Sequence, residues 1–151
     1  MTDDEMAERR RVVQIARSWR KTPYLSRASV QGAGVDCAML PLAVYKAAGL
    51  VPDAVIPPDY SPQWHIHRGG EMYMTFVLKF AKEIPGPPLA GDFVLFRIAR
   101  LFAHGGIVTE WPKIIHARSG HPVFEEDISA NNFGKHALWK TDKRFFSAWA
   151  Q

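Results

Sequence analysis

The sequence contains a single cysteine, Cys37, among 151 residues. One cysteine cannot form a disulfide within the chain, so we expect a fold that does not depend on oxidation. No apolar run approaches the roughly 20 residues that a membrane-spanning helix needs, so we expect no membrane span. The N-terminal stretch 1–13 turns from acidic to basic without an apolar segment, unlike a secretory signal. If the protein acts outside a cytoplasm, we expect a route other than a cleavable signal.

A strong excess of charge is also lacking, because the formal net charge is only +4 at pH 7. Basic residues gather in 8–21, and we interpret them as a solvated helix face. No interleaved aromatic platform or known nucleic-acid motif accompanies them, so we expect no specific nucleic-acid partner. Hydrophobic residues make up 47% of the chain, as in ordinary globular proteins. The length therefore predicts one domain over residues 1–151.

The first half of the chain has the apolar spacing of helices. We predict helices over 5–20, 37–48 and 69–83. Gly49 is suited to end the second helix, because glycine readily adopts the left-handed cap conformation. Residues 24–34 and the proline-rich stretch 51–64 are interpreted as loops.

The second half has short runs of β-branched and aromatic residues between turn-forming residues. We predict strands over 92–98, 104–111, 113–119, 136–140 and 143–147. Helices followed by strands predict an α+β domain, with helices packed on one face of an antiparallel sheet.

Cys37 falls where the second predicted helix begins. Asp36 suits the capping position, so the thiol would lie in the first turn. Backbone N–H groups at a helix start favour negative charge and lower a thiol pKa, and the thiolate is the reactive form. The alternative is a buried cysteine that only fills space. Pro41 lacks an N–H group and crowds the carbonyl four residues earlier, so we expect a tightened or kinked first turn.

Two histidines follow on predicted neighbouring strands. His104 opens one strand, and His116 comes twelve residues later on the next, about the length of a hairpin. A thiol nucleophile needs a base within hydrogen-bond reach and a third group that orients the base. A helix that packs across this hairpin would bring the Cys37 sulfur and both imidazoles into line. For one histidine alone, a satisfied and partly exposed side chain is the simpler interpretation.

The blocks "TPY…GVDC", "GDFVLF…HGGIV" and "IIHA" resemble the signature of the NlpC-type cysteine peptidases, which cut peptide links in bacterial cell walls. The resemblance covers residues 11–147. It implies a reduced papain-like domain, with the cysteine on a helix against an antiparallel sheet of five or six strands. It also implies a thiol hydrolase that acts on peptidoglycan peptides without a cofactor.

By this resemblance, Cys37 is the nucleophile, His104 the base and His116 the orienting residue. Tyr24 matches a tyrosine whose hydroxyl helps to bind the oxyanion, and Asp36 matches the acid beside the nucleophile. The His104 imidazole would take the thiol proton to give a thiolate–imidazolium pair.

Residues 83–98, "EIPGPPLAGDFVLFRI", are similar to the branch found in phage and prophage tails. That branch implies tail proteins as partners, and a location in the virion tail, or in the bacterial cytoplasm before assembly, with action on the cell wall. The chain departs from the family at Ala38 and Met39, where a serine and a glycine are usual. The glycine pair that usually follows the tyrosine motif is replaced by "LSRAS".

Two other interpretations remain open. His65 and His67 have a spacing that zinc sites use, with His121 or His104 as a third ligand, although no acidic ligand lies at a convincing spacing. Alternatively, the domain is a structural part of a tail tip, in which the cysteine site is vestigial or serves only self-processing.

Overall fold

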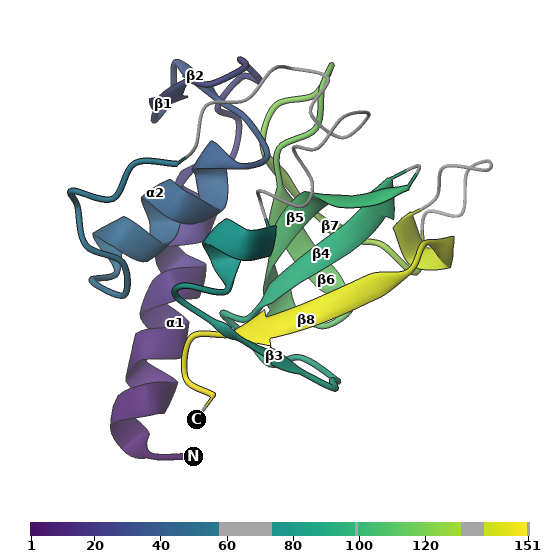
Figure 1. Ribbon diagram of the computed structural model, residues 1–151. Coiled ribbons are helices and arrows are strands. Elements are labelled where there is room, and N and C mark those ends of the chain that lie inside the picture. Colours follow the sequence, from purple (N-terminus) through teal and green to yellow (C-terminus); the bar gives the residue numbers. More distant parts are fainter. Residues whose placement is uncertain (58–73, 99, 131–137, 151) are drawn as a thin grey trace.

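Two helices lie against one face of a six-stranded antiparallel sheet in the computed structural model (Figure 1). The helices are α1 (Asp3–Ser18) and α2 (Met39–Ala47), and they pack against each other and against the central strand β5 (Leu101–Glu110). The structure describes residues 1–57, 74–98, 100–130 and 138–150. The predicted α+β class, with helices on one face of an antiparallel sheet, is confirmed.

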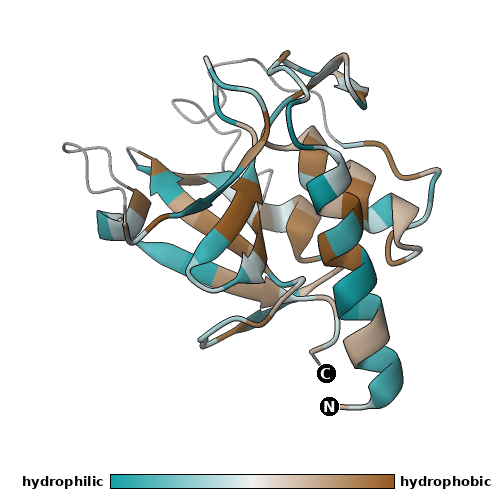
Figure 2. Ribbon diagram, turned by 180° about the vertical axis from the view of Figure 1, so that it is seen from behind, coloured by the Kyte–Doolittle hydropathy of each residue, from teal (hydrophilic) through white to brown (hydrophobic). Residues whose placement is uncertain are grey.

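Helix α1 begins and ends with local signals in the sequence. The Thr2 hydroxyl accepts a hydrogen bond from the Glu5 N–H at 3.1 Å. The first turn is acidic, and its negative side chains stabilise the helix by interacting with the positive end of the helix dipole. Val12 and Ala16 are fully buried against the core. Figure 2 shows the same gradient, with hydrophilic residues toward the N-terminal end of α1 and hydrophobic residues beside α2 and the sheet.

An ion pair fixes α1 to the sheet. The Arg9 guanidinium donates to the Asp92 carboxylate, with Nη1 2.9 Å from Oδ1, and both side chains are almost completely buried. The Arg9 Nη1 also donates to the carbonyl oxygen of Ala90, and the guanidinium lies 4.2 Å from the ring centroid of Trp149. These contacts satisfy a buried charge that would otherwise be costly.

Helix α2 is shorter than predicted. It begins at Met39, and Gly49 follows it with a φ of 79°, as expected for a left-handed cap. Pro41 is the third residue of the helix, where the N–H group has no partner within the helix and its absence costs little. Cys37 therefore lies in a turn ahead of α2.

The sheet contains four of the predicted strands and two that the sequence did not indicate. In spatial order the strands are β3 (Lys82–Ile84), β8 (Lys143–Ser147), β4 (Phe93–Ile98), β5, β6 (Lys113–His116) and β7 (Phe124–Asp127). The edge strands β3 and β7 were not predicted, because they are short and rich in charged residues. A further small sheet, β1 (Ser29–Val30) with β2 (Gly34–Val35), forms within the predicted loop 24–34 and the residue after it.

Two predicted segments, the helix 69–83 and the strand 136–140, need correction and can be compared only in part. Residues 82–83 lie in β3, so the prediction of helix up to residue 83 is wrong there, although 74–77 are helical. Leu138–Lys140 form a 3-10 helix instead of a strand. Residues 78–81 are not helical either, and residues 69–73 and 136–137 lie outside the described part of the chain.

Alternate residues of the central strands enter two hydrophobic clusters. The cluster under the helices contains Phe93, Leu95, Ile107 and Ile115. The cluster on the other face contains Val94, Phe96, Val108 and Ile114. Both faces of the central strands are therefore buried, which explains why residues 93–96, "FVLF", form a continuous apolar run.

Candidate active site

Cys37 lies in the turn between β2 and α2, and only 8% of its surface is exposed. The Asp36 Oδ1 accepts hydrogen bonds from the N–H groups of Ala38 at 3.1 Å and Met39 at 2.9 Å. The N-cap of α2 is Ala38, so the prediction that Asp36 caps the helix with Cys37 in its first turn is wrong, although the Asp36 side chain does bind two N–H groups at the start of the helix. Its other oxygen, Oδ2, accepts from the backbone N–H of Arg27 at 2.7 Å.

The thiol pKa differs from the sequence-based expectation. Burial, and to a smaller extent the nearby Asp36 carboxylate, raise the pKa of Cys37 to about 12. The backbone N–H groups of Cys37 and Ala38 act in the opposite direction, as expected at a helix start, but they are outweighed. The sulfur is thus a neutral thiol at neutral pH, and the predicted lowering of the thiol pKa is wrong.

Tyr24 is held beside the cysteine turn by backbone pairing. It forms a parallel bridge with Val35, whose N–H group donates to the Pro23 carbonyl at 3.0 Å and whose carbonyl accepts from the Leu25 N–H at 3.0 Å. Burial raises the pKa of the Tyr24 hydroxyl, and the neighbouring Cys37 and Asp36 raise it further. The hydroxyl therefore remains protonated at neutral pH and can donate a hydrogen bond.

His104 and His116 form a hydrogen-bonded pair, with His104 Nε2 2.8 Å from His116 Nδ1. The register of β5 and β6 pairs Ile107 with Ile115, which brings His116 opposite Gly106, two residues from His104 on the same face. Gly106 allows β6 to pack closely beside it, since a Cβ there would lie 2.9 Å from Ile114 Cδ1 and 3.5 Å from His116 Cβ. The predicted hairpin arrangement of the two imidazoles is therefore observed.

A glutamate that the sequence analysis did not identify extends this pair. Glu126 Oε1 lies 2.8 Å from His116 Nε2, and the His116 side chain is fully buried. Glu126 lies on β7, and Phe124 on the same strand pairs with His116, their ring centroids 4.9 Å apart. The charged run 124–127 did not suggest a strand, although alternation along "FEED" would have put Phe124 and Glu126 on one face.

Both imidazoles are neutral at neutral pH. Burial lowers the pKa of His104, and the neighbouring His116 and Arg118 lower it further. Burial also lowers the pKa of His116, while the hydrogen bond and charge of Glu126 oppose that shift. A neutral His104 can accept a proton, which a general base requires.

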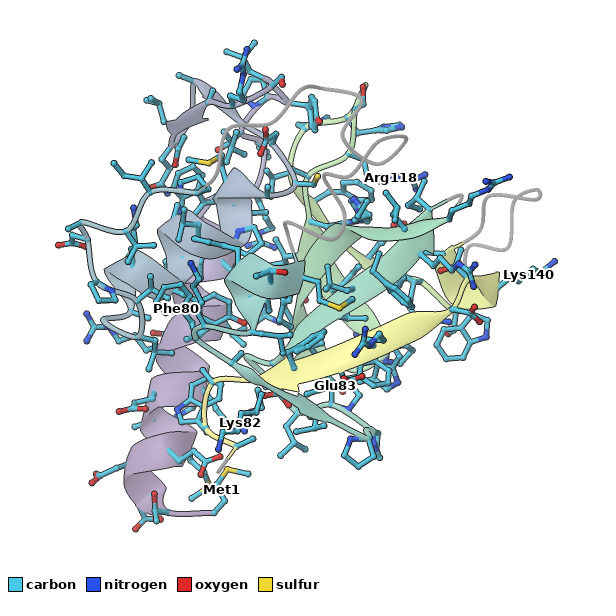
Figure 3. The ribbon with its side chains drawn as sticks, in the orientation of Figure 1. Met1, Phe80, Lys82, Glu83, Arg118 and Lys140 are labelled. Atoms are coloured by element: carbon cyan, nitrogen blue, oxygen red, sulfur yellow. The ribbon has the colours of Figure 1, made fainter. Side chains whose placement is uncertain are left out.

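Hydrogen bonds attach the residues that precede Tyr24 to the end of the sheet where β6 ends and β7 begins. The Lys21 N–H donates to the Val123 carbonyl and the Val123 N–H to the Thr22 carbonyl, both at 2.8 Å. Val123 directly precedes β7, and Arg118, just beyond β6, lies at this end of the sheet (Figure 3). The chain from Tyr24 to Cys37 is thus anchored beside the strands that position His116. That Cys37 and His104 react with each other remains a prediction.

The zinc interpretation finds no support in the described part of the chain. Within residues 1–57, 74–98, 100–130 and 138–150, no three His, Cys, Asp or Glu side chains gather as metal ligands would. His65 and His67 lie outside these residues. His121 contacts Phe124, with ring centroids 6.0 Å apart. Within the same described residues, no helix is both long and apolar enough to span a bilayer.

Neither a family model nor a curated protein matches the sequence, but solved structures match the fold. The NlpC/p60 domain of the peptidoglycan hydrolase SagA is 16% identical with a TM-score of 0.60, covering 90% of this chain and 96% of that chain. NlpC1 from Trichomonas vaginalis is 16% identical with a TM-score of 0.63, covering 93% of this chain and 45% of that chain. An NlpC/p60 family protein from Bacillus cereus is 18% identical with a TM-score of 0.59, covering 90% of this chain and 39% of that chain.

The chain therefore has the fold of NlpC/p60 domains, which is the papain-like fold predicted from the signature blocks. It corresponds to nearly the whole SagA domain, and it spans less than half of the Trichomonas and Bacillus chains.

Proposed function

We propose that this domain is a cysteine peptidase that cleaves peptide bonds in the stem peptides of bacterial peptidoglycan. The observation that supports this most is the hydrogen-bonded pair of His104 and His116. Residues 21 and 22, in the segment that leads to Cys37, are hydrogen-bonded to Val123 beside the strand that pairs with His116. The fold is shared with the NlpC/p60 domain of a peptidoglycan hydrolase. Fold alone does not determine chemistry, so the proposal depends on the residues of the site.

In the proposed reaction, His104 acts as a general base at the moment of attack. The neutral thiol of Cys37 passes its proton to the unprotonated ring nitrogen of His104 as the sulfur bonds to the peptide carbonyl carbon. Collapse of the tetrahedral intermediate breaks the carbon–nitrogen bond, and the His104 imidazolium protonates the leaving amine. Water then hydrolyses the thioester and restores the thiol. In this order of steps the thiol loses its proton only during attack, whereas the amino-acid sequence led us to expect a thiolate–imidazolium pair formed beforehand.

The oxyanion would be stabilised by groups that surround the sulfur. The backbone N–H groups of Cys37 and Ala38 act on the sulfur, and the protonated Tyr24 hydroxyl is close enough for its pKa to respond to Cys37. Each donor aimed at a developing oxyanion is worth about 3 kcal/mol of transition-state stabilisation.

The setting that we propose is a phage or prophage tail, with other tail proteins as partners and the host cell wall as the site of action. The support is the similarity of residues 83–98 to the tail branch of the family. Co-purification of this chain with assembled tail particles would test the association, and its absence from such particles would contradict it.

Mass analysis of muropeptides digested by the purified protein tests the activity. We expect products in which one amide bond has gained a water molecule, and no such products with Cys37→Ala at equal folded concentration. His104→Ala should lower kcat by about 100-fold or more, and His116→Ala should lower it less, because His116 acts only through His104. Undiminished turnover in Cys37→Ala would contradict the proposal, and equal losses in the two histidine variants would contradict the ranking.

A second candidate is a structural tail component with an unused thiol. It is favoured by the low exposure of Cys37, at 8%, and by its raised pKa of about 12. A folded wild-type protein that hydrolyses no muropeptide but assembles into tails would support this candidate instead.

A further inference from the structure

Glu126 is the third member of a continuous hydrogen-bonded chain. The chain runs from His104 Nε2 to His116 Nδ1 over 2.8 Å, and from His116 Nε2 to Glu126 Oε1 over 2.8 Å. Three different strands, β5, β6 and β7, contribute these residues. The arrangement thus depends on the register of the sheet and not on neighbouring positions in the sequence.

We infer that Glu126 is a positioning residue, which fixes the tautomers of both histidines so that Nδ1 of His104 is the free basic nitrogen. The effect of Glu126 on catalysis rests on the proposed function. The tautomers themselves do not depend on that function, because they can be measured in the protein without substrate.

A carboxylate only accepts hydrogen bonds, so the His116 nitrogen that faces Glu126 must bear the proton. A neutral imidazole has one N–H, so the His116 Nδ1 is then an acceptor. The facing Nε2 of His104 must therefore donate, and His104 Nδ1 has a lone pair. In the reverse arrangement His104 would carry its proton on Nδ1 and could not accept one there.

The surroundings of His116 leave it little freedom to rearrange. Its side chain is fully buried, and only 13% of the Glu126 side chain is exposed. The Phe124 ring lies against the imidazole. A carboxylate in this position also stabilises the positive charge that His104 acquires when it takes the thiol proton, as the acid of a serine-protease triad does for its histidine.

The neighbouring Glu125 offers a matched control. Its carboxylate accepts from Arg17 Nε at 3.0 Å and from the Thr109 hydroxyl at 2.7 Å. It is adjacent on the same strand, so its side chain points to the other face of the sheet. Glu125→Gln removes one charge from β7 without altering the hydrogen bonds of His116.

Long-range ¹H–¹⁵N correlation of the imidazole nitrogens in the wild-type protein at pH 7.5 reads the tautomers directly. We expect the proton on Nε2 in both His104 and His116, in the wild type and in Glu125→Gln. In Glu126→Gln, whose side-chain amide can also donate, we expect His116 to populate the Nδ1–H form. A wild-type His116 protonated on Nδ1 would overturn the inference, even if the variant failed to fold.

Kinetics on muropeptides tests the consequence. Glu126→Gln should lower kcat by about tenfold or more with KM changed less than about twofold, while Glu125→Gln retains the wild-type kcat per folded molecule. A wild-type kcat in Glu126→Gln would overturn the positioning role. An inactive wild-type protein that has the expected tautomers would contradict the proposed peptidase function but not the assignment of the tautomers.

Discussion

The carboxylate of Asp36 joins the loop before β1 to the turn that contains Cys37. Its Oδ2 accepts from the backbone N–H of Arg27 at 2.7 Å, and Arg27 has a φ of 62°, in the left-handed region that non-glycine residues rarely adopt. Its Oδ1 accepts from Ala38 and Met39 on the other side. One buried side chain therefore determines both the path of the loop and the position of the thiol.

Asp36→Asn should destabilise the protein and lower the thiol pKa. An asparagine has one acceptor oxygen, so its amide nitrogen would face either the Arg27 N–H or those of Ala38 and Met39. We expect the free energy of unfolding to fall by about 1–3 kcal/mol in urea titration. Because the variant removes the negative charge beside Cys37, its thiol should be alkylated faster at a given pH than the wild type; equal rates in the two proteins would contradict this.

Alkylation of the wild-type protein should follow the raised thiol pKa. Burial raises the pKa of Cys37 to about 12, so the rate with iodoacetamide should increase through pH 9 without reaching a plateau. Cys37→Ala is the control for labelling elsewhere, because Cys37 is the only cysteine in the chain. A plateau below pH 8 would show instead that a thiolate–imidazolium pair exists before substrate binds.

The buried histidines should make the fold sensitive to mild acid. The folded-state pKa values of His104 and His116 lie below the unfolded value, mainly because of burial. The unfolded chain therefore binds more protons below about pH 6.5, and stability that is complete above that pH is lost as the pH falls toward the folded pKa values. We expect the unfolding free energy to decrease between pH 7 and pH 5 by about 1 kcal/mol or more.

His104→Gln should reduce this pH dependence, whereas His121→Gln, at an exposed position, should retain it. An unfolding free energy that is constant from pH 7 to pH 5 in the wild type would be incompatible with neutral buried imidazoles.

Gly106→Ala should disturb the histidine pair through a specific contact. The added Cβ would lie 2.9 Å from Ile114 Cδ1, which is too close, and 3.5 Å from His116 Cβ. We expect a loss of about 1–3 kcal/mol in stability, together with lower activity. Ile114→Val removes the methyl group in question, so the double variant should be less destabilised than the sum of the two single variants. Strict additivity of the two losses would show that the contact is relieved elsewhere.

Arg9→Met should destabilise the folded protein, although Arg9 is far in the sequence from the residues of the candidate site. The variant leaves the Asp92 carboxylate buried, with 1% of its side chain exposed, and without its guanidinium partner. We expect a loss of about 3 kcal/mol in unfolding free energy. Arg10→Met, at the exposed neighbouring position, is the control and should change the unfolding free energy by less than about 0.5 kcal/mol. Similar losses in the two variants would contradict a specific role for the ion pair.

Sequence reasoning predicted the parts of the fold that have strong local signals. The apolar runs that became β4 and β8 and the glycine that ends α2 are readable because periodicity and backbone freedom act locally. The edge strands β3 and β7 were missed because edge strands are short and charged, and only pairing with β8 and β6 makes them strands.

The same distinction applies to the candidate site. The spacing of His104 and His116 predicted their hydrogen-bonded pair, because a hairpin converts sequence distance into contact. Glu126 was missed because its contact with His116 depends on the register of β7 against β6. The thiol pKa was misjudged because helix-start effects can be seen in a sequence, whereas the extent of burial and the orientation of Asp36 cannot.

The strand order has a consequence for how the protein matures. Strand β8, residues 143–147, lies between β3 and β4, so the two are not joined until this late segment has left the ribosome. The helices and the β4–β7 meander can associate earlier during synthesis, but the finished sheet cannot. A nascent chain would thus remain an incomplete domain until β8 has been synthesised.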